Sequence, residues 1–214
     1  MSLEYINNRI NEEICDDIIN KLKDIHLIDE YKKCKSVKKE INKLKLILEK
    51  HDIDIEKREL IINDYMLELV PAGTKGVIRG NIFNTIVKDI IKNMNLDNNI
   101  FEYFFEKQCI IHMTSEIPDW YILNKLTKKI LIGMNQLDLW QGGHQLNRGS
   151  RYLIDNIHNT NDSKLLCIVC NRIKFNNTNT KAYNLFKIGY ENNTLCYIKN
   201  LKSIIIDWFT LNTG

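Results

Sequence analysis

The dipeptide Pro118-Asp119 stands directly before a short apolar run that extends from Trp120 to Leu123. A carboxylate at the edge of a strand, held by a rigid X-Pro step, is well placed to bind a hard cation such as Mg²⁺. The same dipeptide is also common in turns, where it has no chemical role. Asp119 is therefore a candidate metal ligand, and the residues around it decide between this role and a simple turn.

A second polar group closes the next apolar run, which covers residues 129–136 and has the composition of a strand. Asn135, Gln136 and Asp138 interrupt its apolar pattern. Burying such groups unpaired costs about 1–3 kcal/mol each, so a polar function explains them most simply. Since alternate residues share a strand face, Gln136 and Asp138 should lie together, with Asn135 opposite. The predicted catalytic residues are Asp119, Asn135, Gln136 and Asp138, with Asp119 and Asp138 as metal ligands.

The following segment, from Leu139 to Arg151, is dense in side chains that can read bases. Gln and Asn pair bidentately with adenine and Arg with guanine, and the Gly142-Gly143 pair lets the backbone approach a phosphate. The alternative is a loop and helix start whose amides cap their own backbone. The predicted DNA-binding residues are His144, Gln145, Asn147, Arg148 and Arg151, with Lys75 and Arg79 as further phosphate contacts.

The distribution of charge agrees with a polyanionic substrate, although the net charge of +3 alone says little. A basic surface beside a lone acid suits a substrate that must also meet a metal, whereas the alternative is a solvated loop and helix face. Between residues 125 and 151 the chain has one acid, Asp138, and five basic residues: Lys125, Lys128, Lys129, Arg148 and Arg151.

Helices and strands must position these residues, and the hydrophobic periodicity predicts that the two kinds of element alternate along the chain. We also expect a short helix near 98–107, and a helix, a strand near 194–199 and a closing helix within 178–214. The strand at 165–170 is apolar on both faces and should be central in the sheet. The middle of the chain predicts helix, strand, strand, strand, helix and strand at residues 81–94, 109–113, 119–123, 129–136, about 144–157 and 165–170.

The first third of the chain has a different character. No glycine precedes Gly73, so residues 3–70 contain no strong helix breaker. Apolar residues at helical spacing predict two or three amphipathic helices with breaks near 25–29 and 51–54. Residues 71–80 contain a proline and three glycines, which predict a turn-rich junction.

We therefore expect a helical N-terminal region, residues 1–70, packed on an α/β core of residues 71–214, in one compact domain overall. The helical region could be a layer that covers the core, or an arm for dimerisation or DNA clamping. No apolar run approaches the roughly 20 residues that span a bilayer, and no secretory signal is recognisable at Met1-Ser2-Leu3-Glu4. Six cysteines in such a chain are expected to be reduced thiols, so we expect a cytoplasmic protein without membrane partners.

With this element order and an Asp at the head of the second core strand, residues 81–171 resemble the PD-(D/E)XK nuclease superfamily, which includes many type II restriction endonucleases. Asp119 matches the family's Asp. The family's third strand carries an acidic residue, any residue and a Lys, where this chain has Gly133-Met-Asn-Gln136. Gln136 would take the place of the Lys and Asp138 would supply the second carboxylate. Asn84 or Glu68 would have to serve as the acid of the first helix.

The resemblance implies a restriction-endonuclease-like mixed sheet flanked by helices and a metal-assisted hydrolysis of double-stranded DNA by a homodimer. Asp119 and Asp138 would hold Mg²⁺, and Gln136 would orient the attacking water or the phosphate. A second metal, Lys128 or Lys129 would have to supply the charge that the missing Lys does not. Two other hypotheses remain: a nucleic-acid-binding protein with a degenerate site, and a helical interaction module that carries a small sheet.

Overall fold

The computed structural model describes residues 1–109, 116–137, 143–154, 159–170 and 174–210. The chain divides into two compact units, one of residues 1–15 and 84–214, the other of residues 16–83. The expected division was at residue 70, whereas here α1 (Leu3–Glu13) belongs to the unit that contains the sheet. Helix α6 (Ala72–Lys92) begins in one unit and ends in the other.

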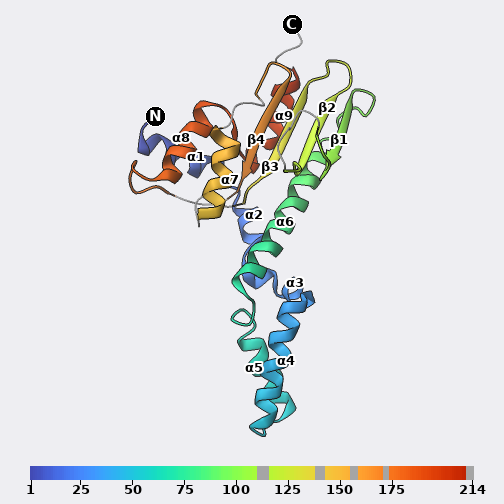
Figure 1. Ribbon diagram of the computed structural model, residues 1–214, viewed down its shortest axis with the longest axis vertical. Coiled ribbons are helices and arrows are strands. Elements are labelled where there is room, and N and C mark those ends of the chain that lie inside the picture. The colour runs from blue at the N-terminus through green and yellow to red at the C-terminus, as the bar shows by residue number, and fades with distance from the viewer. Residues whose placement is uncertain (110–115, 138–142, 155–158, 171–173, 211–214) are drawn as a thin grey trace. The chain divides into compact units, whose positions relative to one another are not determined.

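The larger unit is built on a five-stranded mixed sheet with strands in sequence order (Figure 1). β1 pairs antiparallel with β2, and β2 with β3, whereas β3, β4 and β5 run parallel. This arrangement confirms the α/β class. The strands are β1 (Phe101–Phe105), β2 (Trp120–Asn124), β3 (Ile130–Asn135), β4 (Ser163–Val169) and β5 (Leu195–Tyr197).

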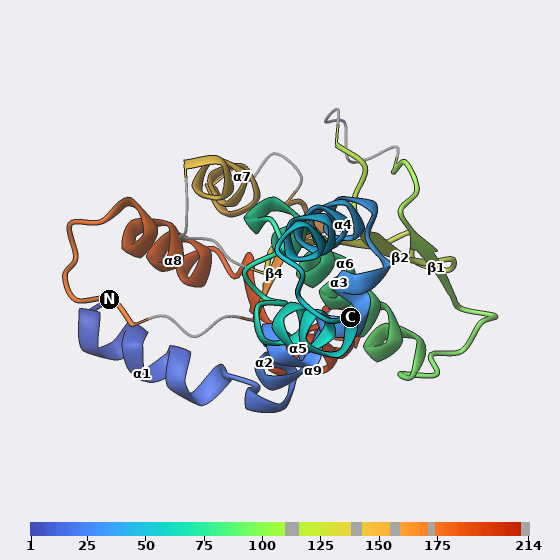
Figure 2. The ribbon, with the colours of Figure 1, turned by 90° about the horizontal axis from the view of Figure 1, so that it is seen from below.

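Helices cover both faces of this sheet (Figures 1 and 2). On one face, Ile132 and Cys167 join a buried apolar cluster with residues of α1, α7 (Gly143–Ile154) and α8 (Lys181–Glu191). On the other, Phe209 of α9 (Leu201–Thr210) packs edge-on against Phe101 of β1, with ring centroids 5.1 Å apart. A short 3₁₀ helix, η3 (Ile198–Asn200), joins β5 to α9.

The smaller unit is entirely helical. A buried cluster that includes Leu27, Tyr31, Val37 and Met66 holds it together, which follows from the helical spacing of its apolar residues. The helices of this region are more numerous and shorter than the two or three amphipathic helices predicted. Within the unit lie α2 (Asp16–Lys21), η1 (Asp24–His26), α3 (Ile28–Lys33), α4 (Lys35–Lys50), α5 (Ile55–Asp64) and the first part of α6.

The prediction of a turn-rich junction at residues 71–80 was wrong, because α6 begins at Ala72. Pro71 suits a helix start, and its carbonyl accepts the first helical hydrogen bond from Lys75. Each glycine inside a helix costs about 1 kcal/mol relative to alanine. Ile78 and Ile82 pack against the buried cluster of the smaller unit, and this packing offsets the glycine cost.

The predicted short helix at 98–107 was also wrong, since Phe101–Phe105 form strand β1. Aromatic residues favour strands, and Phe104 stacks on Tyr121 of β2 with ring centroids 4.3 Å apart. The strand predicted at 109–113 lies, beyond Cys109, outside the described residues. The other strand predictions and the helix at about 144–157 are confirmed to within a few residues.

Candidate functional site

Asp119 lies immediately before β2, where its backbone carbonyl accepts a hydrogen bond from the N–H of Glu106. One carboxylate oxygen accepts the backbone N–H of Asn135, at the end of β3, at 2.6 Å. The other accepts the side-chain amide of Asn84, in α6, at 3.2 Å. Residues far apart in the sequence thus converge on this carboxylate.

The two amides are themselves fixed by further hydrogen bonds. Asn135 Nδ2 donates to Asn84 Oδ1 at 3.1 Å, and the indole N–H of Trp120 donates to Asn135 Oδ1 at 3.2 Å. We call Asn84, Asp119, Trp120 and Asn135 the Asp119 network. Because each member is held by another, the orientation of the carboxylate is set by α6, β2 and β3 together.

Gly133 makes room for this arrangement. It is directly opposite Trp120 in the antiparallel pair of β2 and β3. A Cβ atom added at Gly133 would overlap the indole ring of Trp120. The absence of a side chain at 133 therefore allows Trp120 to lie across β3 and reach Asn135.

Burial raises the pKa of Asp119 above its usual value. The hydrogen bonds from Asn135 and Asn84 and the positive charge of Arg148 lower this pKa, whereas the charge of Glu106 raises it further. Desolvation is the largest of these effects. A carboxylate that is poorly solvated in its charged form would be stabilised by a cation placed beside it.

Helix α7 confirms the predicted helix and carries several of the predicted DNA-binding residues, of which Arg148 acts on Asp119. Arg148, Arg151 and Asn147 are exposed. Arg148 acts electrostatically on Asp119, and Arg151 Nη1 forms an ion pair with Glu116 at 3.2 Å. His144 and Gln145 belong to α7, but their side chains lie outside the described part of the chain.

Asn147 and Tyr152 of α7 bind partners from other parts of the larger unit. Asn147 accepts a hydrogen bond from the ammonium of Lys181 in α8 at 3.2 Å. The hydroxyl of Tyr152 donates to Glu116, which also receives the Arg151 pair. Glu116 therefore ties the segment before β2 to α7, and this acid was not recognised from the sequence.

Lys75 and Arg79 lie in α6 and contact an acid of the smaller unit. Arg79 Nε donates to Asp24 Oδ1 at 3.0 Å, and Lys75 Nζ is 3.7 Å from Asp24 Oδ2. The hydroxyl of Tyr31 donates to the same carboxylate at 2.6 Å, and burial together with this contact raises the pKa of Tyr31 to about 12. These ion pairs give both basic residues a structural role within the helical unit.

The remaining predicted site residues are less fully placed. Gln136 is buried just beyond β3, and its backbone N–H donates to the carbonyl of Ile168 in β4 at 2.8 Å. Asp138 lies outside the described residues. Asn84, one of the two residues proposed for the first helix, does reach Asp119, whereas Glu68 precedes α6.

Lys128 and Lys129 cannot assist Asp119 as proposed. Both lie in the turn before β3, at the opposite end of that strand from Asn135. Six residue steps along a strand span roughly 20 Å. Lys129 Nζ instead lies 6.0 Å from the centroid of the Trp208 ring in α9. Among the described residues, Arg148 of α7 is a cation whose charge acts on Asp119.

The residues of the Asp119 network offer oxygen atoms suited to Mg²⁺, which proteins bind through one or two carboxylates together with substrate phosphates and water. Asp119 supplies one half-buried carboxylate, and Asn84 and Asn135 bring amide oxygens. Among the described residues no cluster of three or more His, Cys, Asp or Glu side chains could hold a metal. Asp138, which the sequence predicts as the second carboxylate, lies outside the described residues.

Family models, curated proteins and solved structures were all compared with this chain, and none of them matches it. No helix among the described residues has the length and apolar character needed to cross a membrane.

Proposed function

We propose that the protein is a metal-dependent DNA endonuclease that resembles type II restriction enzymes. The observation that carries the proposal is the Asp119 network, in which a half-buried carboxylate of raised pKa is fixed by amides from α6 and β3. The element order α6, β1, β2, β3, α7, β4 supports it, since the helix-strand-strand-strand-helix-strand order is the core that the resemblance implies.

Asp119 and Asp138 would hold Mg²⁺, which when bound would lower the pKa of a water molecule and offset phosphate charge. Asn84 and Asn135 fix the orientation of the Asp119 carboxylate. Gln136 orients the attacking water or the phosphate. Arg148 contributes positive charge beside Asp119, in the role proposed from the sequence for Lys128 or Lys129.

DNA would lie along α7, where Arg148, Arg151 and Asn147 are exposed. His144 and Gln145 belong to the same helix, and a residue pattern of this kind can read base edges in the major groove. A palindromic site would require a homodimer, because two-fold symmetry in the DNA is matched by two-fold symmetry in the protein.

Cleavage of several unmethylated plasmids, with Mg²⁺ and with EDTA, tests this proposal. A nuclease produces discrete fragments with Mg²⁺ and none with EDTA. If no divalent ion supports cleavage, the alternative is a non-catalytic nucleic-acid-binding protein with a degenerate site. That alternative is favoured by the absence of an acid-X-Lys sequence on β3, and it predicts DNA binding that persists in EDTA.

A further inference from the structure

Helices α4 and α5 of the smaller unit form a hairpin whose apolar residues are poorly covered. Residues 38–61, all of which the structure describes, include none that is buried, although Ile41, Leu44 and Leu48 stand at helical spacing. Leu46 and Ile47 are more than half exposed. Helices in proteins are stabilised mainly by packing of an apolar face, and two helices alone cover such faces only in part. The hairpin therefore offers apolar surface to a partner.

Most of this apolar surface lies on one side of the hairpin. An ion pair of 2.6 Å between Lys45 and Glu59 shows where the two antiparallel helices face each other. Counted from these two residues at about 100° per residue, five apolar positions fall on the same side of both helices. The opposite side has Leu46 and Leu60. We call the first the apolar side of the hairpin, which consists of Leu44, Ile47 and Leu48 of α4 with Ile61 and Tyr65 of α5 and its C-cap.

The two helices of the hairpin have opposite charge. Helix α4 has six lysines and two glutamates. Residues 51–64, which include α5, have five acids against Lys57 and Arg58. At neutral pH α4 is therefore positive, and α5 with the loop before it is negative.

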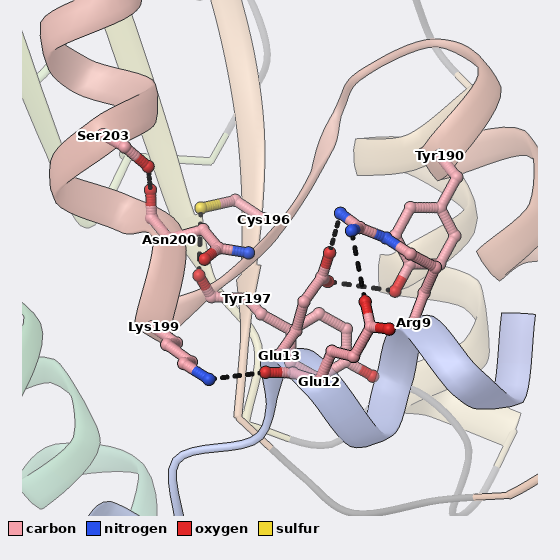
Figure 3. A network of polar contacts seen from close by, with 9 residues as sticks. All are labelled: Arg9, Glu12, Glu13, Tyr190, Cys196, Tyr197, Lys199, Asn200 and Ser203. Carbon is pink, nitrogen blue, oxygen red and sulfur yellow. Dashed lines mark hydrogen bonds and ion pairs between the residues drawn. The ribbon is translucent and has the colours of Figure 1, made fainter.

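Much of this charge has no partner within the chain. In the larger unit, around the cavity lined by α1 and η3, Arg9 pairs with both Glu12 and Glu13 (Figure 3). The hairpin also has internal ion pairs, but several of its charged residues lack one. Among the described residues no ion pair involves Lys35, Lys38, Lys39 and Lys50 of α4, or Asp52, Glu56 and Asp64.

We propose that the apolar side of the hairpin binds the same side of a second copy of the chain, so that two hairpins form a four-helix bundle. A two-fold axis parallel to the helices places α4 of each copy against α5 of the other. An axis perpendicular to the helices would instead place α4 against α4, with six lysines on each. Charge complementarity therefore selects the parallel axis.

This arrangement brings particular apolar residues together. A two-fold axis parallel to the helices leaves each residue at the same height in both copies. With a rise of about 1.5 Å per residue, Leu44 and Ile61 lie about 1.5 and 3 Å from the level of the Lys45–Glu59 pair, in the same direction. Leu44 of one copy thus lies across from Ile61 of the other. A second copy is also the partner that a palindromic site requires, and to that extent the inference rests on the proposed function.

Ile47→Asp and Leu46→Asp form a matched pair of variants. The two residues are adjacent and similarly exposed, by 53% and 59%, but lie on opposite sides of α4, so both variants should fold. Sedimentation equilibrium of the full chain without DNA should show a wild-type dimer at micromolar concentration. The dissociation constant should rise roughly tenfold or more in Ile47→Asp, because a charge would enter the interface, and stay unchanged in Leu46→Asp.

A monomeric wild type, or a dimer that Leu46→Asp disrupts and Ile47→Asp does not, overturns the inference. The outcome is distinguishable from a failure of the proposed function. A dimer that does not cleave DNA overturns the proposed function alone, whereas cleavage by a monomer overturns this inference alone.

Cysteine cross-linking tests the arrangement of the two copies and does not depend on weakening the dimer. Leu44→Cys and Ile61→Cys proteins, mixed to exchange subunits and mildly oxidised, should form a disulfide between the two kinds of chain. Peptide mass spectrometry identifies the linked pair. Neither protein should form a disulfide at its new cysteine when oxidised alone. A link between two Leu44→Cys chains, or no link in the mixture, overturns the arrangement.

Discussion

The carboxylate of Asp119 is half-buried, and the balance between its desolvation and its hydrogen bonds gives its contribution to stability a defined pH dependence. Its pKa is raised in the folded protein relative to the unfolded chain. As pH rises through the usual range of an aspartate toward this raised pKa, the unfolded state loses its proton first. The contribution of Asp119 to stability is therefore present at low pH and decreases as pH rises.

Replacing Asp119 with Asn removes this titration while keeping the shape of the side chain. Relative to the wild type, the free energy of unfolding of Asp119→Asn should therefore increase as pH rises from below the usual aspartate pKa to neutrality. Denaturant unfolding of both proteins at a series of pH values measures this difference. A difference that is constant with pH would show that burial does not raise the pKa of Asp119.

Metal binding at Asp119 has a readout that does not require catalysis. A ligand that binds only the folded state raises its stability, by about 2.7 kcal/mol at a hundredfold excess over Kd. Mg²⁺ should therefore raise the Tm of the wild type and have a much smaller effect on Asp119→Asn. An equal rise in both proteins would place the metal elsewhere.

Arg148 is the basic residue whose charge acts on Asp119, and Arg151 on the same helix is its natural control. Arg148→Ala should reduce Mg²⁺-dependent cleavage by roughly tenfold or more, in keeping with the loss of a charge near the reacting phosphate. Arg151→Ala, which loses a largely exposed pair with Glu116, should reduce it less. Steady-state rates on one plasmid compare the two variants, and the reverse order would remove Arg148 from the site.

At the scale of elements, the glycines divide into two kinds. Gly133 of β3 has no room for a side chain because the Trp120 ring covers it. Gly133→Ala should destabilise the protein by about 1–3 kcal/mol, in the range of overpacked cores, and should disturb the Asp119 network as Trp120 moves. Thermal unfolding and the tryptophan fluorescence spectrum report both effects.

Gly76 of α6 is the matched control, since no atom lies within 4 Å of a Cβ added there. Gly76→Ala should stabilise the protein by about 0.5–1 kcal/mol, because alanine is the better helix former. Stabilisation by Gly133→Ala, or destabilisation by Gly76→Ala, would contradict the packing described for β3 or α6.

The elements that were predicted well are those whose secondary structure follows from the residues within the element and next to it. β2, β3 and β4 are short apolar runs bounded by turn signals, and α7 has a strong helical period. The errors at 71–80 and 98–107 arose where tertiary contacts overrode local preference. Ile78 and Ile82 pack α6 despite its glycines, and Phe104 pairs with Tyr121 across two strands.

Only those parts of the candidate site that show a local residue pattern were predicted. Asp119 and Asn135 were recognised because polar residues at strand ends stand out from an apolar pattern. The role of Trp120 was not, because an aromatic residue in a strand normally signals core packing. Its partner Gly133, opposite it in the next strand, is the one sequence feature that could have indicated the close approach.

At the scale of the whole molecule, the proposed DNA contacts are mainly electrostatic. Neutralised phosphates release counterions, so the logarithm of the DNA affinity should fall linearly with the logarithm of salt concentration. Fluorescence anisotropy with a labelled duplex, between low and physiological salt, measures this slope. A helical interaction module without DNA affinity predicts no binding at any salt concentration.

Cleavage of unmethylated plasmid DNA by the wild type and by Asp119→Ala, side by side in Mg²⁺, tests the central claim most directly. We expect the wild type to cut and the variant to lose cleavage by roughly 10²-fold or more, because the metal ligand is removed. DNA affinity, measured in parallel, should be largely retained. Wild-type cleavage by Asp119→Ala would contradict the assignment of Asp119 as the centre of the site.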